Sequence, residues 1–228
     1  MIKYVLVDLD DTIFDFRRAE KTAVDDALNR SGVQTSEKML SRYSEINLSQ
    51  WKLHELGKLT KPQVKIERFR ILSDEFGLSL NPEKTTALYE SILGTTGFLL
   101  DGAEDFLKTL KKKFSVYAVS NGGVRTQHNR LTASGVKDYF DGVFLSEEIG
   151  SPKPNKDFFD FVARSIPNFN AEYAVLVGDS LSSDVKGGIT ANIKTIWFNP
   201  ENAENLSPYK PNFTVRSLKE AEKIIFSL

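Results

Sequence analysis

The chain has 228 residues, a formal net charge of −1 and a pI near 6.2. This charge balance argues against a nucleic-acid-binding protein, for which a basic surface and a high pI are typical. The chain has no cysteine, which excludes disulfides, thiolate catalysis and zinc–sulfur sites. No stretch approaches the length of a membrane-spanning helix, and the N-terminal apolar run is too short for a signal peptide. We therefore expect a soluble cytoplasmic protein with neither a membrane nor a nucleic acid as partner.

The first predicted strand, residues 2–7, ends in a cluster of carboxylates. It runs directly into Asp8-Leu9-Asp10-Asp11-Thr12. Burying aspartates at the end of a core strand costs free energy unless a metal or a reaction compensates. Alternate residues of an extended chain project to the same side, so Asp8 and Asp10 can share one cation and one substrate. The alternative is an ordinary turn, because aspartate is a common turn residue.

Helices, and no convincing strand, are predicted between residues 16 and 97. The helix boundaries are marked by N-cap residues and by terminal glycines, namely Thr60, Asn81, Gly32, Gly57 and Gly77. The pattern indicates a compact helical insertion after the first strand. We therefore expect one domain formed by residues 1–15 and 98–228, and a second formed by residues 16–97.

The remainder of the chain alternates apolar strands with helical patterns. The predicted strands are 114–119, 142–145, 174–177, 193–198 and a weaker one at 213–215. The predicted helices between and after them are 103–112, 125–134, 156–165, 183–191 and 218–226. This alternation predicts an α/β fold: a doubly wound parallel sheet with helices on both faces and an inserted helical bundle.

Three further polar motifs fall at the predicted C-terminal ends of strands, where open α/β sheets bind their ligands. Ser120-Asn121 is followed by two glycines and a helix, which together can form an anion site. Lys153 stands between two prolines, and Asp179 and Asp184 follow the strand at 174–177. Each motif alone is also compatible with an ordinary turn, a surface lysine or a first-turn helix acid.

The combination of these motifs is more informative than any one of them. Several carboxylates, one lysine and one hydroxyl converge on one edge of one sheet. Carboxylates in one pocket repel each other unless a divalent cation neutralises them. All-oxygen ligands together with a phosphate substrate point to Mg²⁺.

The ordered motifs Asp-x-Asp-x-Thr, strand-Ser-Asn-Gly, Lys-Pro and Gly-Asp-x4-Asp resemble those of the haloacid dehalogenase superfamily of aspartate-nucleophile hydrolases. The similarity spans essentially the whole chain, and the helical insertion resembles that superfamily's C1 cap. The resemblance implies that Asp8 is the nucleophile and forms an aspartyl-phosphate. It implies that Asp10 protonates the leaving oxygen and then activates water. Dehalogenases themselves lack this second aspartate, so phosphatase chemistry is favoured.

The resemblance also implies roles for the other motif residues. Asp8, the Asp10 carbonyl and Asp179 would hold Mg²⁺, with Asp184 beside the metal. Ser120 and Asn121 would bind phosphoryl oxygens, Lys153 would neutralise charge at the nucleophile, and Thr12 would support the loop.

We expect residues of the helical insertion, 16–97, to determine substrate selectivity. Asn47 and Trp51 are four residues apart on a predicted helix and therefore share a face, where an amide and an indole could read a planar base. Helix packing is the alternative explanation for Trp51. Phe14 and Phe16 could line the entrance or seal the hinge, and Arg68 could reach a polar group or lie on a helix surface.

The stretches at 46–51, 56–60 and 178–188 are similar to bacterial pyrimidine 5'-nucleotidases. We therefore expect a Mg²⁺-dependent phosphatase, monomeric or homodimeric, whose substrate is a small phosphate ester and specifically a 5'-nucleoside monophosphate. Alternatives within the enzymes are a phosphatase of phosphoglycolate or a sugar phosphate, and a sugar phosphomutase. A phosphoryl-accepting signalling module and an inactive binding protein are alternatives outside them. His54 and His128 are expected to have only packing or surface roles.

Overall fold

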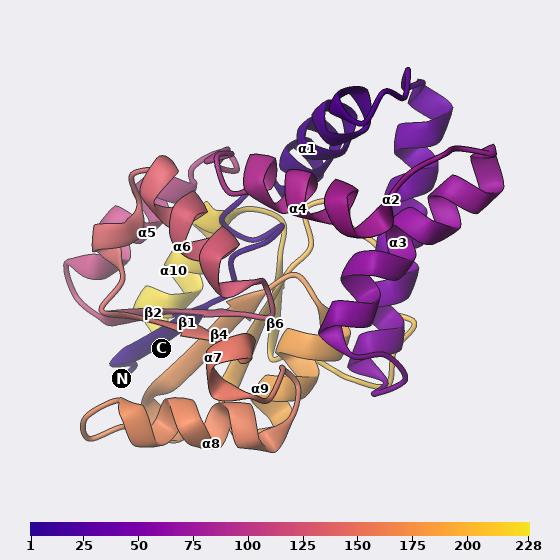
Figure 1. The fold of residues 1–228 in the computed structure, drawn as a ribbon. Coiled ribbons are helices and arrows are strands. Elements are labelled where there is room, and N and C mark those ends of the chain that lie inside the picture. Colours follow the sequence, from indigo (N-terminus) through magenta and orange to yellow (C-terminus); the bar gives the residue numbers. More distant parts are fainter.

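The computed structural model describes residues 1–228 and contains one six-stranded sheet in the order β3-β2-β1-β4-β5-β6, with every neighbouring pair parallel (Figure 1). The strands are β1 (Tyr4–Val7), β2 (Ser115–Ser120), β3 (Gly142–Leu145), β4 (Ala174–Gly178), β5 (Lys194–Phe198) and β6 (Phe213–Val215). The predicted α/β class and all six predicted strands are confirmed. β1 lies between β2 and β4, so the segments that follow these three strands meet at one edge.

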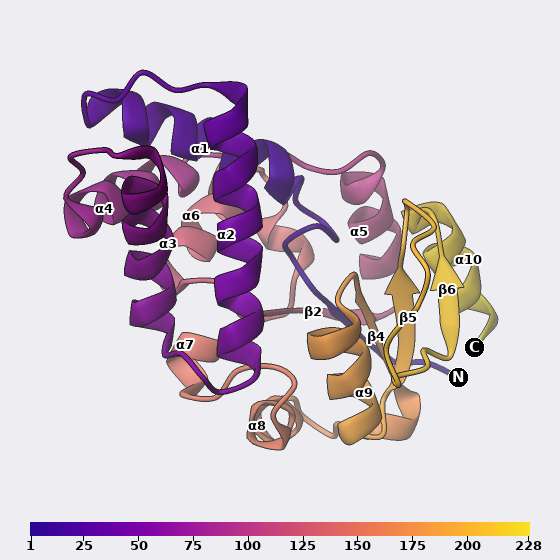
Figure 2. The same ribbon diagram turned by 90° about the vertical axis from the view of Figure 1, so that its right-hand side faces the viewer.

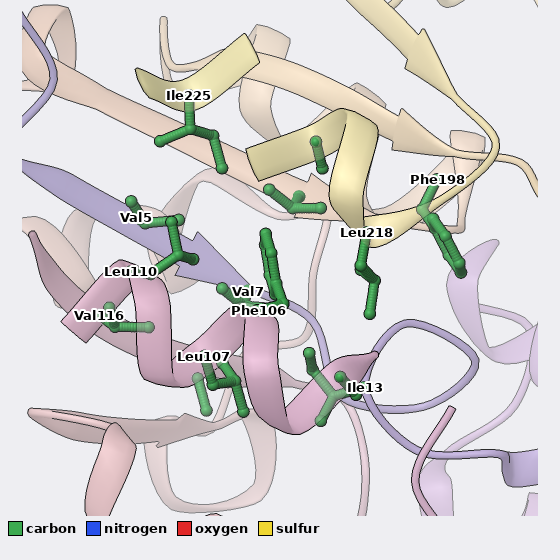
Figure 3. Close-up of a cluster of buried hydrophobic side chains, with 14 of the residues drawn as sticks. Val5, Val7, Ile13, Phe106, Leu107, Leu110, Val116, Phe198, Leu218 and Ile225 are labelled. Carbon is green, nitrogen blue, oxygen red and sulfur yellow. The ribbon is translucent and has the colours of Figure 1, made fainter. Parts of the chain in front are cut away.

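Helices cover both faces of the sheet. Those of the sheet-bearing part are α5 (Ala103–Lys111), α6 (Val124–Ala133), α7 (Ser146–Ile149), α8 (Lys156–Ser165), α9 (Lys186–Thr190) and α10 (Leu218–Ser227), with short 3-10 turns η1 (Lys137–Tyr139) and η2 (Ala171–Tyr173). Because strand side chains alternate, Val5 and Val7 pack against α5 and α10, as Figure 3 shows. Tyr4 and Leu6 face α8 on the other side.

Four helices lie between β1 and α5: α1 (Phe16–Arg30), α2 (Glu37–Glu55), α3 (Lys61–Phe76) and α4 (Pro82–Leu93). We call them the cap helices. They stand beside the sheet (Figure 2) and share an apolar cluster of their own, in which Tyr43, Phe69 and Tyr89 pack ring against ring. The predicted N-cap at Thr60 and the predicted terminal glycine at Gly77 are confirmed: Thr60 forms a capping box with Gln63, and Gly77 is a left-handed C-cap. The division into two domains stays a prediction.

One predicted helix is replaced by two shorter elements. The sequence predicts a single helix over residues 183–191, but a π-helical turn, η3 (Leu181–Val185), precedes the short helix α9. The Val185 N–H donates to the Ser180 carbonyl, five residues back, at 3.1 Å. The wider turn lets the Asp184 side chain fold back toward β4, where its Oδ2 accepts from the Ser180 N–H at 3.1 Å. None of the helices is both long and apolar enough to cross a lipid bilayer.

Candidate active site

A cavity of about 840 Å³ lies between the carboxyl edge of the sheet and the cap helices. Every predicted site residue except Thr12 lines it: Asp8, Asp10, Asn47, Trp51, Ser120, Asn121, Lys153, Asp179 and Asp184. Thr12 is fully buried, and its hydroxyl has no hydrogen-bond partner. The parallel register explains the convergence, because β1, β2 and β4 all end at this edge.

Three carboxylates and one lysine form the centre of the site. Asp8, Asp179 and Asp184 each place a carboxylate oxygen within 4.8 Å of the others. Lys153 Nζ donates to Asp8 Oδ1 at 2.6 Å, to Asp184 Oδ1 at 2.7 Å and to the Val119 carbonyl at 2.9 Å. All three donor positions of the ammonium group are therefore used. The lysine side chain is buried, so water screens its charge little within this cluster.

Negative charge exceeds positive charge in this cluster. Burial, together with the nearby Asp184, raises the pKa of Asp8 to about 8, although Lys153 opposes the shift. Burial and the neighbouring Asp8 and Asp184 raise the pKa of Asp179 well above its usual range. Buried carboxylates whose ionised forms are disfavoured by burial and by one another suit a hard divalent cation, which supplies the missing positive charge. The residues present therefore fit Mg²⁺, as the sequence predicts.

The Ser120-Asn121-Gly122 motif is hydrogen-bonded to the loop that carries Lys153 through one side chain. The Asn121 amide donates to the Lys153 carbonyl at 2.9 Å, and the Lys153 N–H donates to Asn121 Oδ1 at 2.9 Å. Ser120 Oγ accepts from the Gly122 N–H at 3.0 Å. A Cβ on Gly122 would lie 2.6 Å from the Gln127 side chain, so only glycine fits there. The Asn121 side chain thus has a structural contact that sequence reasoning did not anticipate.

Asp10 contacts two residues that sequence reasoning missed. Gln127 Nε2 donates to Asp10 Oδ2 at 2.8 Å and to Ser120 Oγ at 2.9 Å. Arg130 forms an ion pair with Asp10 through Nη1. Both residues lie on α6, three positions apart and thus on one face. The only available signal was a glutamine and an arginine at helical spacing directly after the Ser-Asn-Gly motif.

Comparison with known proteins decides the family. Residues 2–192 match haloacid dehalogenase-like hydrolases. The chain belongs to this family of hydrolases. It is 36% identical to the HAD-hydrolase YfnB of Bacillus subtilis, over 97% of this chain and 94% of that protein. The magnesium-bound crystal structure of that protein covers 98% of each chain with a TM-score of 0.94.

Two other relatives have names that state a substrate. The pyrimidine 5'-nucleotidase PynA of Streptococcus pneumoniae is 35% identical, over 96% of this chain and 92% of that protein. The pyrimidine 5'-nucleotidase YjjG of Escherichia coli is 28% identical, over 97% of each chain. The resemblance identified from the motifs is thereby confirmed.

The cap side of this hydrolase's cavity contains a buried polar network. Asn47 Nδ2 donates to Glu20 Oε1 at 2.6 Å, and Arg68 Nη1 donates to Asn47 Oδ1 at 3.0 Å. Glu20 also accepts from Ser44 Oγ at 2.5 Å. Burial is the main cause that raises the pKa of Glu20. Arg68 is buried with its guanidinium 4.4 Å from the Tyr89 ring centroid, so its assignment to a helix surface is excluded.

The aromatic and histidine residues take distinct places. Phe16 and Trp51 line the cavity, whereas Phe14 is fully buried and does not line it. The Trp51 ring meets His54 edge-on at 5.6 Å between centroids. His54 Nδ1 lies 2.8 Å from the Leu59 carbonyl, and His128 lies 3.6 Å from Glu148. Neither histidine contacts the acidic cluster, in agreement with the packing and surface roles expected of them.

Proposed function

We propose that this hydrolase is a Mg²⁺-dependent phosphatase that hydrolyses 5'-nucleoside monophosphates, preferring pyrimidines, through a phosphoryl group on Asp8. The main observation behind the proposal is that two carboxylates on one loop, those of Asp8 and Asp10, have different surroundings. Asp8 is buried against Lys153 in the acidic cluster, whereas Asp10 has its own donors and faces the cavity. Two carboxylates in different environments can divide nucleophilic and acid–base roles. The names of the PynA and YjjG relatives support the substrate class.

The first half-reaction transfers the phosphoryl group to the protein. Asp8 attacks phosphorus, the bond from phosphorus to the ester oxygen breaks, and Asp10 gives its proton to that oxygen. In the second half, Asp10 takes a proton from water as the water oxygen attacks phosphorus and the bond to Asp8 breaks. Asp8, Asp179 and the Asp10 carbonyl would hold Mg²⁺, which would supply the positive charge that the buried carboxylates lack and would favour the ionised form of the nucleophile.

The remaining site residues position the phosphoryl group and the loops. We assign the Ser120 hydroxyl and the Asn121 N–H to phosphoryl oxygens, and the Lys153 ammonium group to the charge that develops beside Asp8. Asp184 anchors Lys153 and lies next to the metal ligands. We assign Thr12, which is fully buried, to support of the loop that carries Asp8 and Asp10.

Selectivity is assigned to the cap side of the cavity. Trp51 offers a flat apolar face, and the Glu20–Asn47–Arg68 network offers donors and acceptors beside it. This combination suits a heterocyclic base better than a small two-carbon acid, because an acid of that size would not reach both surfaces. The bound base would stack on the indole while its edge meets the polar network.

A substrate panel tests the proposed function. Phosphate release would be measured with Mg²⁺ from dUMP, dTMP, dAMP, glucose 6-phosphate and phosphoglycolate at equal concentrations, with EDTA as control. We expect kcat/KM to be highest for dUMP and dTMP and activity to vanish in EDTA. Preference for glucose 6-phosphate or phosphoglycolate would contradict the assignment of the cap. Activity that persists in EDTA would contradict the metal.

Replacing Trp51 with alanine is expected to raise KM for dUMP about tenfold with little change in kcat, because base–aromatic stacking contributes about 1–3 kcal/mol. Steady-state kinetics on dUMP would measure this, and KM for p-nitrophenyl phosphate serves as an internal reference. The variant Trp51→Phe keeps an aromatic face and should recover most of the affinity. Equal KM values for wild type and Trp51→Ala would assign the indole to packing.

A further inference from the structure

The reaction described above assigns no role to Gln127 or Arg130. Both side chains are nevertheless buried beside Asp10. Each oxygen of Asp10 has its own donor, because Gln127 donates to Oδ2 at 2.8 Å and Arg130 pairs with Oδ1. The two donors are also joined, since Arg130 Nη1 donates to Gln127 Oε1 at 3.1 Å. Gln127 in turn links Asp10 to Ser120 Oγ, a proposed phosphate ligand.

Arg130 is held by the two chain segments that connect the sheet to the cap helices. Its Nε donates to the Thr96 carbonyl at 3.3 Å, after α4. Its guanidinium lies 4.2 Å from the centroid of the Phe14 ring, before α1. These segments are bonded to each other, since Phe14 forms an isolated bridge with Leu99. A fully buried arginine that contacts both connections has little freedom to move.

We propose that Gln127 and Arg130 are positioning residues that fix the Asp10 carboxyl group for proton transfer to the leaving oxygen. This inference rests on the proposed phosphatase function. An aspartate side chain on a loop can otherwise rotate about two bonds, and a misplaced acid transfers its proton slowly. Neither α6 residue needs to touch the substrate, because both act through Asp10. The bridge through Gln127 additionally sets the distance between the acid and the phosphate ligand Ser120.

The test compares esters that differ in their need for an acid. The nucleoside oxygen of dUMP must be protonated as it leaves, whereas p-nitrophenolate leaves without a proton. We use kcat/KM because it reports the steps up to release of the leaving group. Arg130→Met should lose about 100-fold or more in kcat/KM for dUMP and less than about fivefold for p-nitrophenyl phosphate. Arg130→Lys, which retains the charge, should recover part of the loss.

Two further variants separate positioning from folding. Gln127→Leu removes one donor without removing a buried charge, and its loss in kcat/KM should be about tenfold greater for dUMP than for p-nitrophenyl phosphate, because the lost contact with Ser120 affects both esters alike. Arg125→Met makes the same change at an exposed position of α6 and should alter neither ester. Equal losses on both esters in well-folded Gln127→Leu and Arg130→Met would assign a structural role and overturn the inference. A wild-type protein that cleaves neither ester would instead overturn the proposed function, and the inference with it.

Discussion

Replacing Asp8 with asparagine is expected to lower kcat for phosphate release by about 10⁴-fold or more, because the amide cannot form the phosphoryl intermediate. Asparagine has nearly the same shape, so the fold should be retained. Lys153 keeps its contacts with Asp184 and the Val119 carbonyl. Phosphate release from dUMP under saturating Mg²⁺ measures the effect. A loss of less than about 100-fold would contradict the assignment of the nucleophile.

The same variant should alter the pH dependence of stability in EDTA. The pKa of Asp8 is raised from 3.8 to about 8 by burial, so the folded protein binds this proton more tightly than the unfolded chain does. The preferential binding of this proton therefore stabilises the folded protein at low pH, and this stabilisation is lost as the pH rises from about 4 through about 8. Asparagine does not ionise, so Asp8→Asn should not lose stability in this pH range and should have a higher melting temperature than wild type at neutral pH. An unchanged pH profile would contradict the raised pKa of Asp8.

Replacing Lys153 with methionine is expected to produce the largest loss of stability. The variant leaves Asp8 and Asp184 buried without their shared cation, and removing one partner of a buried ion pair costs about 3–5 kcal/mol. For a chain of this size the melting temperature should fall by about 10 °C. Phosphate release should fall by about 100-fold or more, because the charge beside the nucleophile is lost.

The control for Lys153→Met is Lys156→Met, which removes an exposed lysine paired with Asp160 and should change stability little. Added Mg²⁺ should stabilise Lys153→Met more than wild type, because the cation then supplies charge that the lysine no longer provides. Thermal unfolding with Mg²⁺ and with EDTA measures both effects. A melting temperature within about 2 °C of wild type in EDTA would contradict the electrostatic description of the cluster.

The sheet and the residues at its carboxyl edge could be predicted because the sequence signals for them are local. Each strand is a short apolar run, and each site motif follows directly after one, so parallel order alone brings Asp8, Ser120 and Asp179 together. The π-helical turn at 181–185 could not be predicted. It places the Asp184 side chain close against β4, where a Cβ on Gly178 would lie 2.3 Å from it, and a contact between residues of two elements has no local signal.

The polar residues that were not predicted have only a weak local signal. Gln127 and Arg130 look like ordinary helix residues until α6 is placed against the Asp10 loop. Glu20 belongs to α1 and pairs with Asn47 of α2, so its burial is decided by how two helices pack. The sequence placed Asn47 and Trp51 on one face, which is confirmed because both line the cavity. The expectation that they contact substrate stays a prediction.

The most direct test of the central claim is to capture the phosphoryl group on Asp8. Asp10→Asn would be mixed with p-nitrophenyl phosphate and Mg²⁺, because this ester needs no acid but the phosphorylated protein still needs a base for hydrolysis. We predict a rapid burst of about one equivalent of p-nitrophenolate per protein, and a phosphoryl group that peptide mapping places on Asp8. Steady turnover at the wild-type rate with no phosphorylated protein, or phosphorylation of another residue, would contradict the proposed mechanism.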